Sequence, residues 1–205
     1  MPDTTPSADR PFRVLKREIV WKGFSTLEQV TFERHRRDGT TQTQIFEVEN
    51  HGSAVAVLAY DPARREAVLV RQLRLPQALQ GDPALSLEII AGLLDHPDEP
   101  PAETARREAM EEAGLELTHL EPIGALRPSP ALISEKVWLF LAEVDLDRAR
   151  VADGGGLHHE GEDIEVVVLP LADLARLVDE GREIDLKTAH AVQTLRLKRP
   201  DLFRA

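Results

Sequence analysis

The sequence contains no cysteine among its 205 residues. This absence excludes a disulfide framework, a thiolate zinc site, an iron–sulfur cluster and a cysteine nucleophile, and it fits a cytoplasmic protein. Basic residues are also scarce: 25 Lys and Arg stand against 36 Asp and Glu, which gives a formal net charge of −11. Because nucleic acids and anionic membranes attract basic surfaces, this balance argues against both as partners.

Long hydrophobic runs are missing as well. The longest strongly apolar stretch, residues 53–60, is too short to span a bilayer. Residues 1–10 are polar and lack the apolar centre of a signal peptide, so we expect them to form a disordered tail. The remaining length and the 42% hydrophobic content suit one domain with an arm.

The arm is predicted over residues 11–50 as an antiparallel β-ribbon. Val30 and Phe32 alternate with polar residues, and Asp38-Gly39 supplies a hairpin turn. Such a ribbon has little apolar surface to bury by itself. We therefore expect it to pack on the protein's own core or on a partner subunit.

Residues 51–205 carry the stronger core pattern. We predict several strands and three helices, with Pro101 near the start and Gly114 just past the end of the first helix. This mixture indicates an α/β or α+β sandwich with helices on both sides of a mixed sheet. The predicted strands are residues 53–60, 66–73, 86–90, 136–144 and 164–169, and the predicted helices are residues 102–113, 171–180 and 187–198.

A pair of carboxylates on the first helix is the most informative feature. Glu108 and Glu112 are four residues apart, so they lie one above the other on the same helix face. Like charges at this spacing repel, unless a divalent cation lies between them. Mg²⁺ suits such a site because it binds oxygen ligands and shares its coordination sphere with phosphates. The ordinary alternative is a solvated helix face with weak ion pairs.

The surrounding residues favour the cation site. Residues 92–115 carry the pattern G-x6-E-x7-R-E-A-M-E-E-A-G-L, which resembles the Nudix hydrolase signature G-x5-E-x7-R-E-U-x-E-E-x-G-U, with U bulky and apolar. The gap from Gly92 to Glu99 is one residue longer than in the signature, and Ala109 is small. We align Glu99 because it keeps the spacing to Arg107. The insertion falls in the loop before the helix and should leave the glutamate pair intact.

The resemblance implies a β-sheet between helices, with a loop–helix–loop that holds divalent metal ions, Mg²⁺ or alternatively Mn²⁺ in this chain. By this analogy, Glu108, Glu112 and the backbone carbonyl of Ala91 are metal ligands. Glu111 assists the metal shell through water. Arg107 and Glu99 brace the loop, and the motif glycines Gly92 and Gly114 shape it.

The flanks resemble the ADP-ribose and nucleotide-sugar pyrophosphatase branch of the family, from about Phe12 to the final helix. The matching segments are residues 54–75, LEIIAGLLD and GEDIEV. In this branch, the arginine of a QxR at a strand end contacts the substrate diphosphate, which makes Arg74 the candidate. A plain surface arginine is the alternative. Glu88 and Glu135 are weaker candidates for substrate contacts.

A second acidic cluster follows a glycine-rich loop. Resemblance to the branch's E-x-E-D-I pattern makes Glu160 the expected general base and Glu162 a further metal ligand. His158 or His159 is the alternative base, because histidine titrates near neutral pH. The tri-glycine segment (residues 154–156) lacks the residues that follow it in a P-loop, so we interpret it as slack that lets Glu160 move.

These residues suit hydrolysis of a diphosphate. A metal-bound water would attack phosphorus, Glu160 would take its proton, and Arg74 would share the developing charge. We expect near-absolute dependence on a divalent cation. The expected substrate is ADP-ribose, which gives AMP and ribose 5-phosphate. GDP-mannose is the alternative, giving GMP and mannose 1-phosphate, because the insertion before the helix and Asp185–Thr188 resemble that type.

The branch also predicts a homodimer in which the N-terminal ribbon is swapped and lines the partner's site. One rival is a catalytically inactive Nudix-fold regulator. Such proteins typically lose the motif glutamates. This chain retains them as Glu108, Glu111 and Glu112. Another is a Nudix hydrolase of oxidised nucleotides or capped RNA. The net charge of −11 argues against a long RNA partner, and the long N-terminal ribbon argues for a nucleotide-sugar enzyme.

Overall fold

The computed structural model describes residues 11–157, 161–182 and 184–204. The chain divides into two compact units. The first comprises the residues up to Gly52 together with Ser129–Glu135, and the second comprises Ser53–Pro128 and Lys136–Ala205. Within the described residues, no helix is both long enough and apolar enough to cross a membrane.

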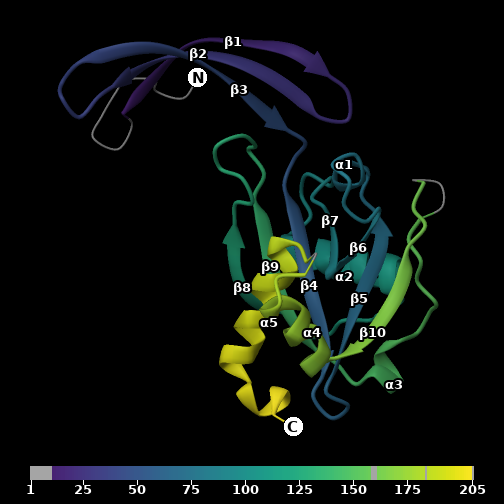
Figure 1. The fold of residues 1–205 in the computed structure, drawn as a ribbon. Coiled ribbons are helices and arrows are strands. Elements are labelled where there is room, and N and C mark those ends of the chain that lie inside the picture. The colour runs from purple at the N-terminus through teal and green to yellow at the C-terminus, as the bar shows by residue number, and fades with distance from the viewer. Residues whose placement is uncertain (1–10, 158–160, 183, 205) are drawn as a thin grey trace. The chain divides into compact units, whose positions relative to one another are not determined.

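The first unit is an antiparallel sheet in the order β1-β2-β3, formed by β1 (Phe12–Lys22), β2 (Thr26–His35) and β3 (Thr41–Asn50) (Figure 1). The predicted turn is present between β2 and β3. There, Gly39 adopts a φ of 82° and Thr40 N–H donates to Asp38 Oδ1 over 3.0 Å. The strand β1 adds a third strand to this hairpin.

Large apolar side chains remain exposed on the first unit. The sheet has no second layer among the described residues of the unit to cover its faces, and Phe46 on β3 is 51% exposed. The ring of Phe32 makes edge-to-face contacts with the rings of Phe12 and Phe46. These contacts cover only part of the apolar side chains of the unit. The other exposed large apolar residues of the unit are Phe12, Leu15, Ile19, Val20, Trp21, Phe24, Ile45 and Leu132.

The second unit contains a mixed seven-stranded sheet. Its main path is β10-β5-β4-β9-β8, in which β6 also pairs with β5 and β7 with β4. Among these strands of the described chain, β4 and β9 are parallel, and the other pairs are antiparallel. The strands are β4 (Ala54–Asp61), β5 (Glu66–Leu73), β6 (Leu85–Glu88), β7 (Ile90–Leu93), β8 (Glu121–Leu126), β9 (Val137–Glu143) and β10 (Glu165–Pro170).

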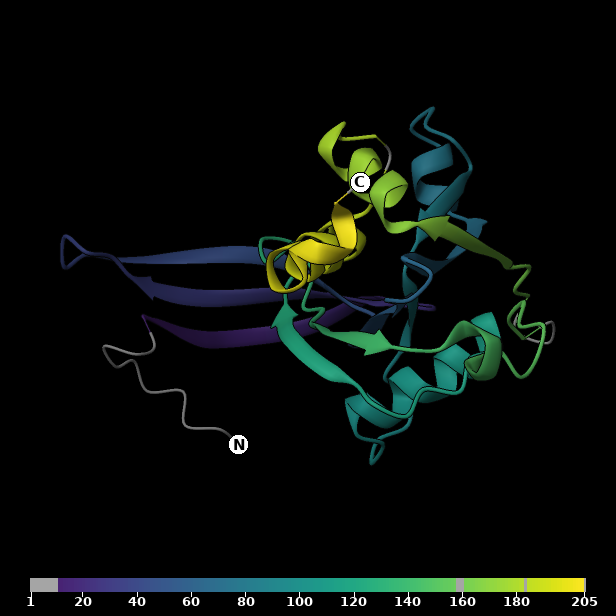
Figure 2. The same cartoon turned by 90° about the horizontal axis from the view of Figure 1, so that it is seen from below.

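Helices cover both faces of this sheet (Figure 2). Along β4, Val55 and Val57 point toward the core that includes α2 (Pro101–Ala113). Ala56 and Leu58 point the other way, into the core shared with α4 (Leu171–Asp179) and α5 (Leu186–Lys198). All four side chains are fully buried, because successive residues of a central strand point to opposite faces of the sheet and helices cover both faces. The predicted sandwich of helices around a mixed sheet is confirmed.

The strand predicted over residues 86–90 is wrong in one respect, because the chain breaks it into β6 and β7. Ile89 lies between them, and its N–H donates to Thr188 Oγ1 on α5 over 2.9 Å instead of joining a strand ladder. This contact lets the chain leave β5 and pair with β4. The single-turn helices α1 (Leu75–Ala78) and α3 (Leu146–Ala149), the 3-10 helix η2 (Pro200–Phe203) and β8 were not predicted.

Candidate active site

The helix α2 begins after Pro100 and ends at Gly114, which adopts the left-handed conformation with a φ of 65°. Its buried face is built from alanines. Ala105, Ala109 and Ala113 are completely buried against β4 and β5. Small side chains let the helix lie close to the sheet, which accounts for alanine at position 109, where the Nudix pattern has a bulky residue.

Glu112 is held against the backbone of β7. Its side chain is 2% exposed, and Oε2 accepts a hydrogen bond from Ala91 N over 3.0 Å. Burial and the nearby charges of Glu108 and Glu162 raise the pKa of Glu112 to about 8, against the opposing effects of the Ala91 N–H and of Arg74. Ala91, the predicted backbone ligand, therefore lies directly beside Glu112.

Glu108 lies over Gly92, the next residue of β7. A Cβ at position 92 would be 1.9 Å from the Glu108 carboxyl carbon, so only glycine leaves room for this side chain. Burial, together with Glu111 and Glu162, raises the pKa of Glu108 to about 7, although Arg107 opposes the shift. Two stacked acids thus share a desolvated site.

This arrangement suits a divalent cation. Glu112 is buried and the side chain of Glu108 is only 13% exposed. With pKa values raised to about 7 for Glu108 and about 8 for Glu112, the two carboxylates lack sufficient positive charge around them to ionise together. A cation with oxygen ligands would supply that charge. Across residues 11–157, 161–182 and 184–204, no three His, Asp or Glu side chains are grouped closely enough to hold a metal. Further ligands of the cation would come from a backbone carbonyl, from water, from a substrate phosphate or from the loop that carries Glu162.

Arg107 joins four acidic residues, two on α2 and two in the loop that precedes it. Its guanidinium lies 2.9 Å from both Glu108 and Glu111. It also lies 3.5 Å from Glu99 and 3.3 Å from Asp95, both in the loop that precedes the helix. Arg107 therefore ties the inserted loop to the helix, as a bracing residue would.

A second charged cluster lies at the end of β5. Arg74 donates to both oxygens of Glu88 over 2.7 and 3.1 Å, and Lys187 from the first turn of α5 also pairs with Glu88. Glu88 is 3% exposed; burial opposes its charge, but the bonds from Arg74 and Lys187 outweigh this effect and lower its pKa to about 2. The charge of Arg74 also acts on Glu112, whose pKa it lowers against the effect of burial.

Lys187 was not singled out from the sequence. Asp185 accepts hydrogen bonds from the backbone amides of Lys187 and Thr188 and thus begins α5. The helix start presents the lysine to Glu88. The signal was available in the Asp-x-Lys-Thr of residues 185–188, but only the capping geometry shows which side chain reaches the cluster.

The remaining candidates fall in three places. Glu162 accepts a hydrogen bond from Leu157 N over 2.8 Å, and its charge acts on both acids of α2. Glu135 belongs to the first unit, where its carboxylate lies 3.5 Å from His51 Nε2. Glu160 lies outside the described residues, and so do His158 and His159.

The tri-glycine segment is packed, which contradicts the expectation of slack. Gly155 N donates to Glu112 O over 2.9 Å and Gly156 N to Glu111 O over 3.0 Å. These backbone bonds fasten the segment to the end of α2. Freedom to move would require breaking them.

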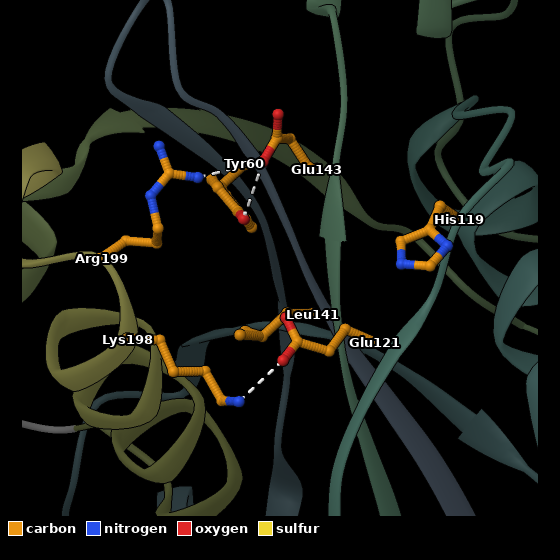
Figure 3. Close-up of a pocket in the computed structure, with 7 residues that line it drawn as sticks. All are labelled: Tyr60, His119, Glu121, Leu141, Glu143, Lys198 and Arg199. Atoms are coloured by element: carbon orange, nitrogen blue, oxygen red, sulfur yellow. Dashed lines mark hydrogen bonds and ion pairs between the residues drawn. The ribbon is translucent and has the colours of Figure 1, made fainter.

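A cavity of about 330 Å³ lies elsewhere in the second unit, between the end of α5 and strands β8, β9 and β4 (Figure 3). Lys198 pairs with Glu121 over 2.7 Å, and Arg199 with Glu143 over 3.2 Å. Both cations thus have carboxylate partners, and none of the residues that line this cavity is among the candidate site residues.

Comparison with known proteins identifies the family. The NUDIX domain model matches residues 50–191. The GDP-mannose pyrophosphatase of Cronobacter sakazakii (strain ATCC BAA-894) is 34% identical over 186 residues, which cover 90% of this chain and 95% of that protein. The enzyme of the same name from Pectobacterium atrosepticum is 33% identical over 184 residues, which cover 89% and 93%.

A solved structure is also similar. The crystal structure of an ADP compounds hydrolase matches with a TM-score of 0.71 and 21% identity, over 95% of this chain and 97% of that one. This likeness supports the fold. The family match covers well over half of the chain and includes the helix with the two buried glutamates: the protein belongs to the Nudix family, and it is a Nudix hydrolase.

Proposed function

We propose that the protein hydrolyses the diphosphate linkage of a nucleoside diphosphate sugar with the help of a divalent cation, Mg²⁺ by preference and Mn²⁺ as a substitute. The observation that carries this proposal is the buried pair of Glu108 and Glu112 with Arg74 nearby. The acids would hold the cation, and the arginine would meet the anion that the cation also binds.

The chain's own residues supply most of the positioning. In the absence of substrate, Glu88 pairs with both Arg74 and Lys187. Asp185 also lies 3.1 Å from Lys187, and these ion pairs keep the side chains of Arg74 and Lys187 in place. A substrate phosphate would attract the exposed part of Arg74, whose side chain is 40% exposed. Lys187, anchored by the start of α5, would provide a second positive charge at the same substrate.

The bound cation would polarise the phosphoryl oxygens and lower the pKa of a water molecule. Glu111, held 2.9 Å from Arg107, would accept hydrogen bonds from the surrounding water. Glu160 is our proposed general base and would take the proton of the attacking water. Glu162, whose charge acts on both Glu108 and Glu112, would add negative charge at the cation site.

GDP-mannose is our first candidate substrate. The curated relatives that share 33–36% identity across most of their length carry that activity in their names. These relatives reverse our sequence-based preference for ADP-ribose. ADP-ribose remains the second candidate, because the QxR at residues 72–74 and the GEDIEV segment resemble the branch that cleaves it.

The test is a substrate panel with the full-length chain. We expect GDP-mannose to be cleaved to GMP and mannose 1-phosphate in MgCl₂, faster than ADP-ribose and ATP, with products separated by ion-exchange chromatography. Addition of excess EDTA should abolish turnover, and MnCl₂ should restore it. Undiminished hydrolysis in EDTA, or cleavage of ATP alone, would contradict the proposal.

We also propose that the first unit is a dimerisation arm. Its apolar side chains have no covering layer among the described residues of the unit, and a second copy of the chain would bury them. The branch resemblance further suggests that the arm lines the site of the partner subunit.

We expect Phe46→Asp to convert the dimer to a monomer and to abolish activity at the same time, because a charge on that surface opposes burial. Gln42→Asp, at an exposed polar position on the same strand, is the matched control and should stay dimeric. Light scattering and turnover of GDP-mannose give the two readouts. A fully active Phe46→Asp monomer would show that the arm has another role.

A further inference from the structure

The tri-glycine segment closes the end of α2. The last carbonyls of any α-helix have no amide partner within the helix. Here the carbonyls of Glu111 and Glu112 accept from Gly156 N over 3.0 Å and from Gly155 N over 2.9 Å. The two capped residues are the ones whose side chains belong to the acidic site.

Only glycine fits this contact at two of the three positions. Gly154 has a φ of +73°, and a Cβ there would lie 2.6 Å from Glu112 O and 2.7 Å from Ala113 Cα. Gly156 has a φ of +77°, and its Cβ would lie 2.5 Å from Glu162 Oε2. The first contact is with backbone atoms of α2, so a rotation of a side chain would not relieve it.

The same segment fixes the residues that follow it. Gly155 O accepts from Ile164 N over 3.1 Å, at the start of the approach to β10. Glu162 Oε2 accepts from Leu157 N over 2.8 Å, one residue after the glycines. The segment is thus bonded to α2 on one side and to the loop that carries Glu162 on the other.

We propose that the tri-glycine segment is a positioning element that sets the spacing between Glu112 and Glu162, and thereby builds the acidic site that binds the divalent cation. This inference rests on the proposed function. It assigns the glycines a role in cation affinity, in addition to any contribution to folding. Neither Gly154 nor Gly156 would touch the cation or the substrate.

Hydrogen exchange in the wild-type protein gives the first test and needs no variant. We expect the amide protons of Gly155 and Gly156 to exchange slowly, in line with those in the last turn of α2, because both donate to its carbonyls. Exchange at the rate of an unstructured peptide would overturn the proposal.

Two matched variants give the second test. Gly156→Ala places a methyl group against Glu162, whereas Gly181→Ala, at a φ of +64° with no described atom within 4 Å of the new Cβ, imposes only the backbone strain. We measure Mn²⁺ affinity by water-proton relaxation in the absence of substrate, and kcat and KM for GDP-mannose in MgCl₂. Melting temperatures show that each variant is folded during the assay.

We expect Gly156→Ala to bind Mn²⁺ about 10-fold more weakly or worse, the size of effect seen when a partner that orients a metal ligand is lost. Its kcat should fall, with little change in KM at saturating MgCl₂. Gly181→Ala should lower the melting temperature and keep its Mn²⁺ affinity. A folded Gly156→Ala with wild-type Mn²⁺ affinity would overturn the role assigned to the tri-glycine segment and would leave the proposed function unaffected. Failure of the wild-type protein to bind Mn²⁺ would overturn the proposed function.

Discussion

Glu112→Gln is expected to lower kcat by about 10²–10³-fold, the range observed when one charge-stabilising group is removed from an active site. The amide keeps the size of the side chain but removes the negative charge that would hold the cation. Glu112 is the most buried acid of the site, so no water replaces the lost ligand without rearrangement. Turnover of GDP-mannose in saturating MgCl₂ measures the effect.

The fold should tolerate this substitution. The amide oxygen of the substituted side chain can still accept the Ala91 N–H that now bonds Glu112 Oε2 over 3.0 Å. The variant also removes a carboxylate whose ionisation is opposed by burial and by Glu108. We therefore expect the cation-free variant to melt at the same temperature as the parent or higher, which separates a loss of chemistry from a loss of structure.

Glu103→Gln is the matched control. It makes the same substitution on the same helix, at a side chain that is 57% exposed and pairs with Arg106. Exposed ion pairs contribute little to stability, so kcat and the melting temperature should stay close to the parent values. Equal turnover by Glu112→Gln and the parent would contradict the role we assign to the buried pair.

Much of the second unit was accessible from the sequence. The strand β5 has the predicted bounds, and α2 begins one residue earlier than predicted. Both segments carry strong local patterns: a continuous apolar run in β5, and alanines with terminal proline and glycine in α2. The weaker pattern of β8, with Pro122 and Gly124, gave no such signal.

Contacts between distant segments were not accessible. The break at Ile89 depends on a hydrogen bond to Thr188, 99 residues further along the chain. The second ion pair of Glu88 likewise comes from Lys187, which no local pattern connects to it. The interpretation of the tri-glycine segment as slack failed for a related reason. Glycine permits slack and close backbone contact alike, and only its neighbours distinguish the two.

The pH dependence of stability offers an independent test of the buried pair. The pKa values of Glu108 and Glu112 are raised in the folded protein to about 7 and about 8, from an ordinary value of 4.5. The folded state therefore binds more protons than the unfolded state between these limits. Since stability falls with rising pH wherever that holds, the cation-free protein should lose stability from about pH 5 to about pH 8. Each pKa unit corresponds to about 1.4 kcal/mol.

Other groups make a control necessary. Glu88, whose pKa is lowered to about 2, contributes stability that is lost only as the pH falls below about 4.5, outside this range. His51 does act within it: burial opposes its charge, but Glu49 and Glu135 outweigh burial and raise its pKa, so its contribution is also lost as the pH rises. The double variant Glu108→Gln/Glu112→Gln keeps the histidine and removes only the acids.

We therefore expect urea unfolding in EDTA to give a steep decline in the free energy of unfolding between pH 5 and pH 8 for the parent, and a much flatter one for the double variant. MgCl₂ should stabilise the parent most at pH 8, where both acids are ready to ionise, because a ligand that binds only the folded state adds its binding free energy to stability. Parallel curves for the two proteins would mean that the acids are not desolvated together. That result would contradict the desolvated site from which we infer the cation.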